Sequence, residues 1–309
     1  MSTVRMSSIA LLRYAGLTIL TDPSFLHKGD HVHLGYGLTS QRLTEPALGL
    51  EQLPQVDFVL LSHLHEDHFD RLVEESLDKA LPIVTTPQAA AKLRRKGFHG
   101  ARGLRTWETL VVRSGDVTVR VTAMPGRHGP GFVNRLLPDV MGTMVEYEKA
   151  GEGLCLRLYI SGDTLVHDEL REIPRRYPGI DLALLHLGGT RVLGVLVTMD
   201  ARQGVQALRL IGPRMAVPLH YDDYDVFKSP LDEFAAAVRE AGLETHVSYV
   251  ARGDRYAFRP SELRAMPVVV AEPRAVRPRH VPWPAVLAGA SAAGLAWIVF
   301  RSRRRGARA

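Results

Sequence analysis

Four side chains of the types that bind metal ions lie within one short segment, FVLLSHLHEDHFD (residues 58–70). They are His63, His65, Asp67 and His68, and they follow an apolar run, residues 56–61, that is typical of a buried strand. If the chain stays extended beyond that strand, His63 and His65 point the same way, because strand side chains repeat every two residues. Asp67 and His68 follow where the backbone can turn into a helix. The spacing therefore indicates two adjacent sites, the first pair binding one metal ion and the second pair another.

The pattern His-x-His-x-Asp-His after an apolar strand resembles the signature of the metallo-β-lactamase superfamily. This resemblance implies an α/β protein with the four-layer αββα sandwich of that superfamily, and it requires three further ligands downstream. The chain offers them in the required order, as His128 after Pro-Gly-Arg, Asp163 in Ser-Gly-Asp-Thr and His220 in Pro-Leu-His-Tyr. The ligand set that the resemblance implies is His63, His65 and His128 for the first ion, Asp67, His68 and His220 for the second, and Asp163 bridging both.

The resemblance further implies hydrolysis that depends on two divalent metal ions. Two ions about 4 Å apart lower the pKa of a shared water toward neutrality and polarise the carbonyl or phosphoryl oxygen of a substrate. We therefore expect a dinuclear metal-dependent hydrolase in which a metal-bridging hydroxide attacks an ester-type bond, with Asp67 and Asp163 as catalytic residues. The only cysteine, Cys155, cannot form a thiolate-rich cluster, and we expect its side chain to be buried. Imidazole and carboxylate ligands favour zinc as the expected metal and are compatible with manganese or iron.

Within the superfamily, four short motifs resemble the branch that contains ascorbate-6-phosphate lactonase and N-acylphosphatidylethanolamine phospholipase D. They are Thr-Asp-Pro at 21–23, Gly-Arg-His at 126–128, Ser-Gly-Asp-Thr at 161–164 and Pro-Leu-His-Tyr at 218–221, and the likeness extends over residues 8–260. The leading expectation is a membrane lipid phosphodiester as substrate, and a soluble lactone or phosphate ester is the alternative. A metal-dependent nuclease and a non-enzymatic, membrane-tethered binding protein remain as further alternatives. The di-iron oxidoreductase branch usually has a glutamate where this chain has His65, which argues against redox chemistry.

Other polar residues lie near these motifs in the sequence. Asp22 either accepts a hydrogen bond from a ligand histidine or forms a turn before Pro23. The long loop that follows, rich in histidine, tyrosine and glycine, suits the wall of a cleft for a small-molecule or lipid substrate. His31 and His33 in this loop could be further metal ligands, although contact with substrate or a surface role is the expectation. The candidate substrate contacts are His31, His33, Tyr36, Arg127, His186 and Tyr221.

Alternating strands and helices must position these side chains. His128, for example, lies at the end of a predicted strand, where a loop can turn it back toward His63 and His65. The predicted strands are 8–12, 17–21, 56–61, 83–85, 110–112, 117–124, 141–148, 154–160, 180–185, 215–219, 245–250 and 255–258, and the predicted helices are 69–80, 87–96, 167–176, 200–211 and 231–241.

The positive charge of the chain is confined to its C-terminal end. The formal net charge is +6, but residues 272–309 contain eight arginines and one acidic residue, which leaves a net charge of −1 for residues 1–271. A neutral body lacks the positive surface that binds phosphate backbones, so no nucleic-acid partner is expected. The sequence does not fix an oligomeric state.

The C-terminal residues also differ in composition from the rest. Prolines mark a linker over residues 266–282, residues 283–300 are apolar and uncharged, and residues 301–309 form a basic tail, which leaves residues 1–265 as the hydrolase domain. As a helix, residues 283–300 would extend about 27 Å, just enough for the hydrocarbon core of a membrane. We expect a membrane helix there, which crosses the membrane or lies in its inner interface. Because the N-terminus lacks a secretory signal, the expected location is membrane-associated, with the catalytic domain in the cytoplasm.

Overall fold

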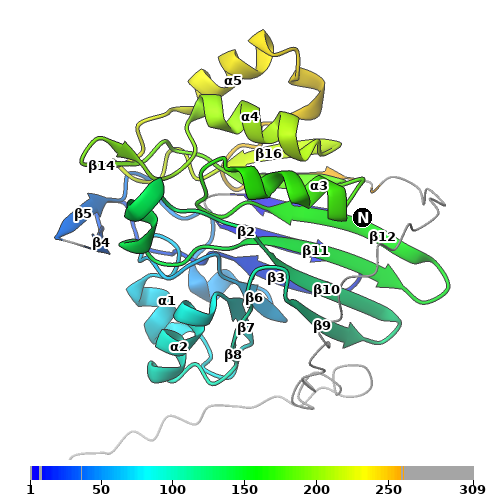
Figure 1. The fold of residues 1–309 in the computed structure, drawn as a ribbon. Helices are drawn as coiled ribbons and strands as arrows, with labels where there is room; N and C mark the ends of the chain where they lie inside the picture. The colour runs from blue at the N-terminus through cyan, green and yellow to red at the C-terminus, as the bar shows by residue number, and fades with distance from the viewer. Residues whose placement is uncertain (1, 7–8, 36, 259, 261–309) are drawn as a thin grey trace, which may run out of the picture.

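Two β-sheets stacked face to face form the centre of the protein in a computed structural model that describes residues 2–6, 9–35, 37–258 and 260 (Figure 1). The first sheet has seven strands, in the order β17 (Arg255–Phe258), β1 (Ser2–Met6), β2 (Ala10–Tyr14), β3 (Leu17–Thr21), β6 (Phe58–Leu60), β7 (Ile83–Thr85) and β8 (Ala101–Gly103). The second sheet has six strands, in the order β16 (Met215–Leu219), β13 (Leu182–His186), β12 (Gly153–Ile160), β11 (Gly142–Lys149), β10 (Val117–Met124) and β9 (Thr109–Ser114).

Helices cover the outer face of each sheet. Val73 of α1 (Arg71–Ser76) and Leu93 of α2 (Pro87–Arg95) pack in a core with residues of the first sheet. On the second sheet, Leu208 of α4 (Ala201–Ile211) and Phe234 of α5 (Leu231–Glu240) are buried in a separate core. Figure 1 shows α1 and α2 on one side of the paired sheets and α4 and α5 on the other. The predicted four-layer αββα sandwich is therefore confirmed.

The central strands are buried on both faces. Around β6, Phe58 and Leu60 lie in the core between the two sheets, whereas Val59 and Leu61 pack toward α1 and α2. β13 divides its side chains between the inter-sheet core and the α4–α5 core in the same way. Because side chains alternate between faces, a strand that is covered on both faces has a continuous apolar sequence. This explains why residues 58–61 and 182–185 are apolar without alternation.

Strands of both sheets end at the same edge of the sandwich. In the first sheet β3 and β6 are parallel neighbours, and in the second sheet β12, β13 and β16 are parallel neighbours. β10 runs in the same direction as β12, because both strands are antiparallel to β11. A backbone hydrogen bond of 3.1 Å from Met141 N to Ser62 O joins the two sheets at this edge. In α/β sheets, ligands are generally bound beyond the carboxyl ends of the strands, so this edge is the expected place for a site.

Two predicted helices are shorter or divided. The first helix is confined to α1, between Asp70, which caps its N-terminus by accepting a hydrogen bond from Val73 N, and Leu77. Residues 167–176 form a 3-10 helix, η3 (Asp168–Arg171), followed by α3 (Glu172–Arg176) on the outer face of the second sheet. Pro174 lies in the first turn of α3, where its missing N–H is not needed, so a helix begins there rather than continuing through it.

Several short extended segments were not predicted correctly. The loop after residue 23 contains a hairpin of β4 (His31–Gly35) and β5 (Leu38–Gln41), and a second hairpin pairs β14 (Arg191–Val192) with β15 (Val195–Leu196). Both hairpins are partly exposed and too short for a clear apolar pattern. The predicted strand 245–250 is instead a 3-10 turn, η4 (Glu244–His246), followed by a loop. Cys155, predicted to be buried, is partly exposed.

The prediction of a membrane-associated protein is wrong on these findings. No helix formed by the described residues has the length and apolar character that a membrane crossing requires, and the longest of them, α4, has 11 residues. Residues 283–300, from which the membrane helix was predicted, lie outside the described residues, as do the predicted linker 266–282 and tail 301–309. An apolar run of this length is at the lower limit for a membrane span, so its composition alone was too weak a basis for the prediction.

Candidate metal centre

Three histidines from two strand ends form a first cluster. His63 and His65 follow β6, and His128 follows β10. His63 Nε2 lies 3.0 Å from His65 Nδ1, and His128 Nε2 lies 3.4 Å from the same atom. The opposite ring nitrogen of His128, Nδ1, lies 2.9 Å from the carbonyl oxygen of Val197 and donates to it. This bond leaves the Nε2 lone pair of His128 free to bind a metal ion, and it fixes the direction in which the ring points.

A second cluster combines two carboxylates with two histidines. Asp67 and His68 follow the first pair of histidines, Asp163 follows β12, and His220 follows β16. His68 Nε2 lies 3.4 Å from Asp163 Oδ2 and 3.7 Å from Asp67 Oδ2, and His220 Nε2 lies 3.5 Å from Asp67 Oδ2. In each cluster, one possible ligand atom from every residue lies within 4.8 Å of the others. The structure thus brings together all seven residues that the resemblance implied.

The polar atoms of the second cluster support metal binding. All four of its side chains are buried, and five of their atoms have no hydrogen-bond partner among the described residues: Asp67 Oδ1, Asp163 Oδ1, His68 Nδ1, His68 Nε2 and His220 Nε2. Burying such atoms without a partner is costly, and buried polar groups are therefore rarely left unpaired. Two carboxylates and two imidazoles are a donor set that zinc, manganese and iron accept. The residues present therefore fit a divalent metal ion.

Burial sets the protonation of the first cluster. It lowers the pKa of His63 well below 6.5, that of His65 to about 3, and that of His128 below its usual value. For His63 and His65, the neighbouring histidines lower the pKa further. All three imidazoles are therefore neutral at pH 7, the state in which a histidine can bind a metal ion.

The second cluster has the opposite electrostatics. Burial alone would lower the pKa of His68 and His220, but the surrounding carboxylates, Asp163 foremost, outweigh it and raise both. Burial likewise would raise the pKa of Asp67, but His68 and His220 lower it to about 2, and they also lower that of Asp163. Both carboxylates are ionised at neutral pH, so this cluster favours positive charge at its centre.

Asp22 connects the ligands to a layer of buried side chains behind them. Its Oδ1 accepts hydrogen bonds from Ser62 N at 2.7 Å and Ser62 Oγ at 2.9 Å, and it lies 3.5 Å from His68 Nδ1. Its Oδ2 lies 3.2 Å from His186 Nε2. Ser62 Oγ in turn lies 3.0 Å from His63 Nδ1. Of the two roles considered for Asp22, this geometry supports the one in which its carboxylate lies against a ligand histidine, His68.

The backbone at the centre is constrained. Asp22 and His220 both have left-handed backbone conformations, with φ of 41° and 59°, which are uncommon outside glycine. Gly162, with φ of 59°, precedes Asp163, and a Cβ atom at Gly162 would lie 2.8 Å from both Met141 O and Ser62 Cβ. Only glycine fits at this position without moving its neighbours, which places the carboxylate of Asp163 close to the other sheet.

The predicted substrate contacts lie at different depths. His33 is exposed on β4, and Glu66 Oε2 lies 2.7 Å from its backbone N and 3.3 Å from its ring Nδ1. His31 is also exposed, on the same face of β4. Arg127 is partly exposed, with Nη2 3.4 Å from Glu169 Oε1.

The remaining predicted contacts are less accessible or not described. His186 is completely buried, with its backbone N bonded to Ser161 Oγ at 2.8 Å, so its position supports a role in holding Asp22 rather than contact with substrate. Tyr221 is half-buried against the core around α4 and α5. Tyr36 lies outside the described residues.

Several residues that orient the candidate metal ligands were not predicted from the sequence. Val197, whose carbonyl oxygen accepts from His128, and Thr198, whose Oγ1 donates to Asp163 Oδ2 at 3.1 Å, lie far from both ligands in the sequence. Nothing in their local sequence indicates this role. Ser62 directly precedes the histidine motif, and its hydroxyl group was the one available signal.

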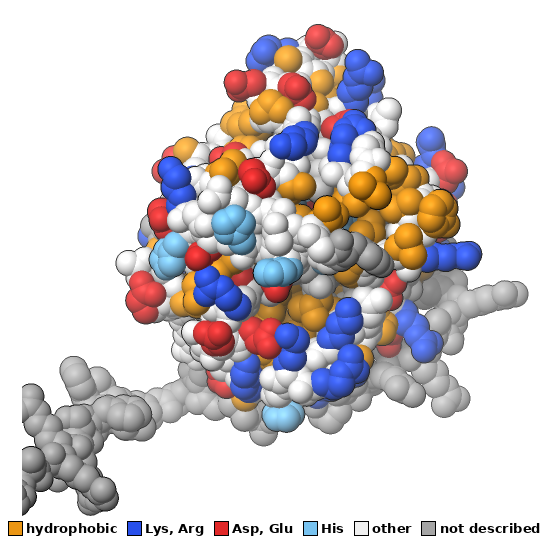
Figure 2. Space-filling model, turned by 90° about the vertical axis from the view of Figure 1, so that its left-hand side faces the viewer, with side chains coloured by type: hydrophobic (Ala, Val, Ile, Leu, Met, Phe, Trp, Pro, Cys, Tyr) orange, Lys and Arg blue, Asp and Glu red, His pale blue; other side chains and the backbone are white. Residues whose placement is uncertain are grey.

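The face of the molecule at this edge is shown in Figure 2, where histidine side chains gather near the middle and many Lys and Arg side chains lie below them. Residues 18–221, which include every candidate ligand, match the family model described as the beta-lactamase superfamily domain. The chain belongs to the metallo-β-lactamase superfamily. It is a metal-dependent hydrolase of that superfamily, since the relatives that it matches are named as metal-dependent hydrolases.

Two curated relatives illustrate how this metallo-β-lactamase-superfamily hydrolase compares with known proteins. A UPF0173 metal-dependent hydrolase of Thermus thermophilus is 30% identical over 203 residues, which cover 65% of this chain and 80% of the relative. One from Nanoarchaeum equitans is 26% identical over 198 residues, covering 64% and 85%. Among solved structures, an isothiocyanate hydrolase from Delia radicum gut bacteria is 23% identical, with a TM-score of 0.69 and coverage of 84% of this chain and all of the other; this likeness concerns the fold alone.

Proposed function

We propose that this hydrolase binds two divalent metal ions, one at each cluster, and hydrolyses an ester-type bond of a small molecule. The observation that carries the proposal is the contact between the clusters: the rings of His63 and His68, one from each, lie 4.2 Å apart between their centroids. Because the two clusters are in contact, ions bound at both could share a bridging ligand. Asp163 is the residue proposed to bridge them, because its Oδ2 lies 3.4 Å from His68 of the second cluster and its charge also opposes the lowering of the pKa of His63 and His128 in the first.

Asp67 and Asp163 are the proposed catalytic residues. Divalent ions at the two clusters would supply a Lewis acid and lower the pKa of a water molecule. The unpartnered Oδ1 of Asp67 is buried at the second cluster, where it can accept a hydrogen bond from the attacking water and hold it in position. Thr198 Oγ1 donates to Asp163 Oδ2, so the direction of that carboxylate is set by the protein.

The favoured substrate class is a lactone or phosphate ester, following the likeness of the four short motifs to the lactonase and phospholipase branch. A lipid phosphodiester is the second candidate. It is favoured by two exposed apolar side chains, Phe132 and Leu136, with 73% and 53% of their surface exposed. They lie in and directly after the 3-10 helix η2 (Gly131–Arg135), and Leu136 lines a cavity next to His65.

Metal analysis combined with hydrolysis assays tests this proposal. We expect two ions for each wild-type chain, and turnover of a lactone, p-nitrophenyl phosphate or a micellar lipid phosphodiester. Asp163→Ala should weaken binding of both ions and reduce kcat/KM by about 100-fold or more, because it removes the proposed bridge. His99→Ala, which changes an exposed histidine outside the clusters, is the matched control. One ion for each fully active chain would refute the dinuclear site, and full metal content without hydrolysis across the panel would refute the substrate class.

A further inference from the structure

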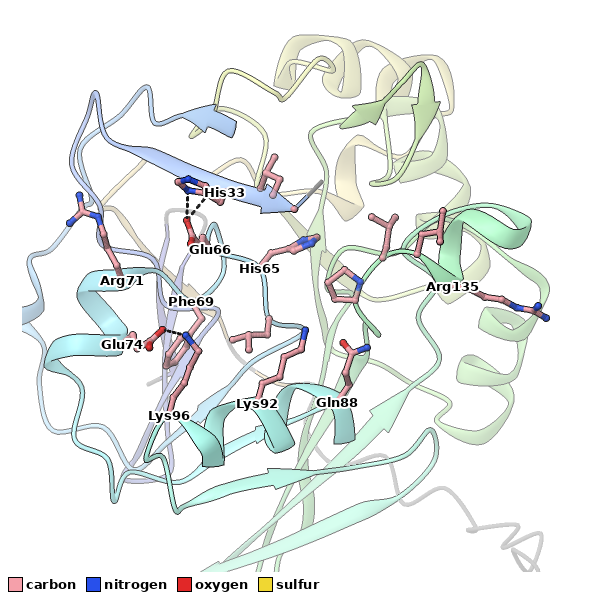
Figure 3. Close-up of a pocket in the computed structure, with 16 residues that line it drawn as sticks. His33, His65, Glu66, Phe69, Arg71, Glu74, Gln88, Lys92, Lys96 and Arg135 are labelled. Atoms are coloured by element: carbon pink, nitrogen blue, oxygen red, sulfur yellow. Dashed lines mark hydrogen bonds and ion pairs between the residues drawn. The ribbon is translucent and has the colours of Figure 1, made fainter. Parts of the chain in front are cut away.

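A cavity of about 500 Å³ opens beside His65 of the first cluster (Figure 3). Its walls come from β4, from the start of α1, from α2 and from the segment 135–138 after β10. Among the seven candidate metal ligands, only His65 lines it. A volume of this size accommodates a small molecule, and a molecule bound there would lie next to the first metal cluster.

Most charged side chains that line this cavity have partners. Lys96 Nζ lies 2.5 Å from Glu74 Oε2, and Arg71 Nη2 lies 2.9 Å from Asp30 Oδ1. Glu66 accepts a hydrogen bond from the backbone of β4. The charged residues of the lining are Glu66, Arg71, Glu74, Lys92, Lys96 and Arg135.

The side chains of the two that remain, Lys92 and Arg135, form no hydrogen bond or ion pair with the described residues. Both carboxylates of the lining are therefore engaged, and the charge that remains uncompensated is positive. An anion would be the complementary ligand, because it offers the acceptors that these side chains lack here.

The direction of the side chains distinguishes Lys92 from Arg135. Figure 3 shows Lys92 and Gln88 extending from α2 toward the space beneath His65, whereas Arg135 points outward from the opposite wall. Lys92 and Gln88 are four residues apart, so they lie on the same face of the helix. Gln88 Oε1 accepts a hydrogen bond from Asp139 N at 3.3 Å, which leaves its amide NH₂ free to donate. The inner wall of the cavity thus presents an ammonium group and an amide donor side by side.

We propose that this cavity is an anion-binding subsite, in which Lys92 and Gln88 hold a carboxylate or phosphate group of the substrate while its ester-type bond lies at the metal clusters. The hydrolase would then act on negatively charged esters in preference to neutral ones. This inference rests on the proposed function. It assigns the substrate class through Lys92, a residue that no sequence motif singled out.

Matched substrates test the subsite in the metal-loaded full-length protein. The probes are p-nitrophenyl esters of increasing acyl length that end in a carboxylate, a phosphate or a neutral methyl ester. Wild type should prefer one of the anionic series at a defined length. Lys92→Ala should raise KM for that series by on the order of ten-fold, the loss expected when a charged hydrogen bond is removed, and change the neutral series by less than about two-fold. Lys92→Glu should give a larger loss for the anions.

Arg95→Ala is the matched control, because Arg95 is an exposed basic residue of α2 that does not line the cavity. It should leave the preference unchanged, and metal content should be the same in all variants. Equal turnover of charged and neutral esters by wild type, or an equal loss for both in Lys92→Ala, would overturn the subsite while leaving the hydrolase proposal intact.

If no ester is hydrolysed, the proposed function fails, and the subsite is then decided by calorimetry with glutarate and inorganic phosphate. Binding by wild type that is weakened in Lys92→Ala but not in Arg95→Ala supports the subsite. Equal binding by all three proteins overturns it.

Discussion

Asp22 is a buried carboxylate directly behind the metal ligands. Its two oxygens reach Ser62, His68 and His186, and it is only 2% exposed. A carboxylate behind a metal-binding histidine fixes the orientation of the ring and makes it a better ligand. The side chain of Asp22 therefore affects metal affinity although it belongs to neither proposed set of three ligands.

We expect Asp22→Asn to weaken metal binding by about 10- to 100-fold, the range usual for such outer partners. Asparagine retains one acceptor for Ser62 but replaces the second oxygen with a donor, and it tolerates the left-handed backbone at this position better than most residues. Competition with a chromophoric chelator measures the affinity. Asp116→Asn, an exposed aspartate in the turn between β9 and β10, serves as control. Equal affinities for the two variants would show that Asp22 acts only as a turn residue.

At the scale of elements, Asp70 ties the start of α1 to the segment that follows β3. Its Oδ1 accepts from Val73 N at 2.9 Å, and its Oδ2 accepts from the backbone N of Phe25 and, at 2.8 Å, of Leu26. The side chain is completely buried. One carboxylate therefore satisfies three backbone donors in two elements that flank the metal clusters.

Replacing Asp70 with alanine should lower the free energy of unfolding by about 2–4 kcal/mol, because it removes a helix cap and leaves two further buried donors without a partner. Urea denaturation followed by circular dichroism measures this loss. Asp78→Ala provides the comparison, since Asp78 Oδ1 accepts only one exposed backbone hydrogen bond, from Ala80 N, and should cost about 1 kcal/mol or less. Similar losses for both variants would contradict the role assigned to Asp70.

The elements that were predicted correctly are those whose buried side chains give an apolar sequence. Residues 56–61, 180–185 and 215–219 correspond to β6, β13 and β16, which are apolar because helices and the other sheet cover both faces. The predicted strand 245–250 failed because only Val247 forms a bridge there, with Ala216 at the edge of the second sheet. Its alternating sequence gave no indication that so little of it would pair.

The candidate site also has parts that could be predicted from the sequence and parts that could not. Ligand types and order were visible in the sequence because metal binding requires particular side chains. The partners that orient them, such as the carbonyl group of Val197, and the unpaired state of Lys92 depend on contacts between distant segments. A backbone carbonyl has no residue type of its own, so no sequence pattern can reveal that it faces a ligand.

For the molecule as a whole, the important feature is that both sheets contribute to the clusters. His63, His65, Asp67 and His68 follow β6 of the first sheet, whereas His128, Asp163 and His220 follow strands of the second. Each proposed ion therefore has ligands from both sheets. Binding would oppose separation of the sheets at this edge, where several buried polar atoms have no hydrogen-bond partner among the described residues.

Removing the ions with a chelator should consequently lower the Tm of the whole protein by on the order of 10 °C. A ligand that binds only the folded state stabilises it by about 4 kcal/mol when its free concentration is 1,000 times Kd, and in a protein of this size each kcal/mol shifts Tm by about 2–4 °C. Scanning calorimetry before and after chelation measures the shift, and added zinc should reverse it. Asp163→Ala should show a much smaller response to chelator. If Tm stays constant while metal content falls to zero, the ions do not hold the sheets together, and the seven ligands serve chemistry alone.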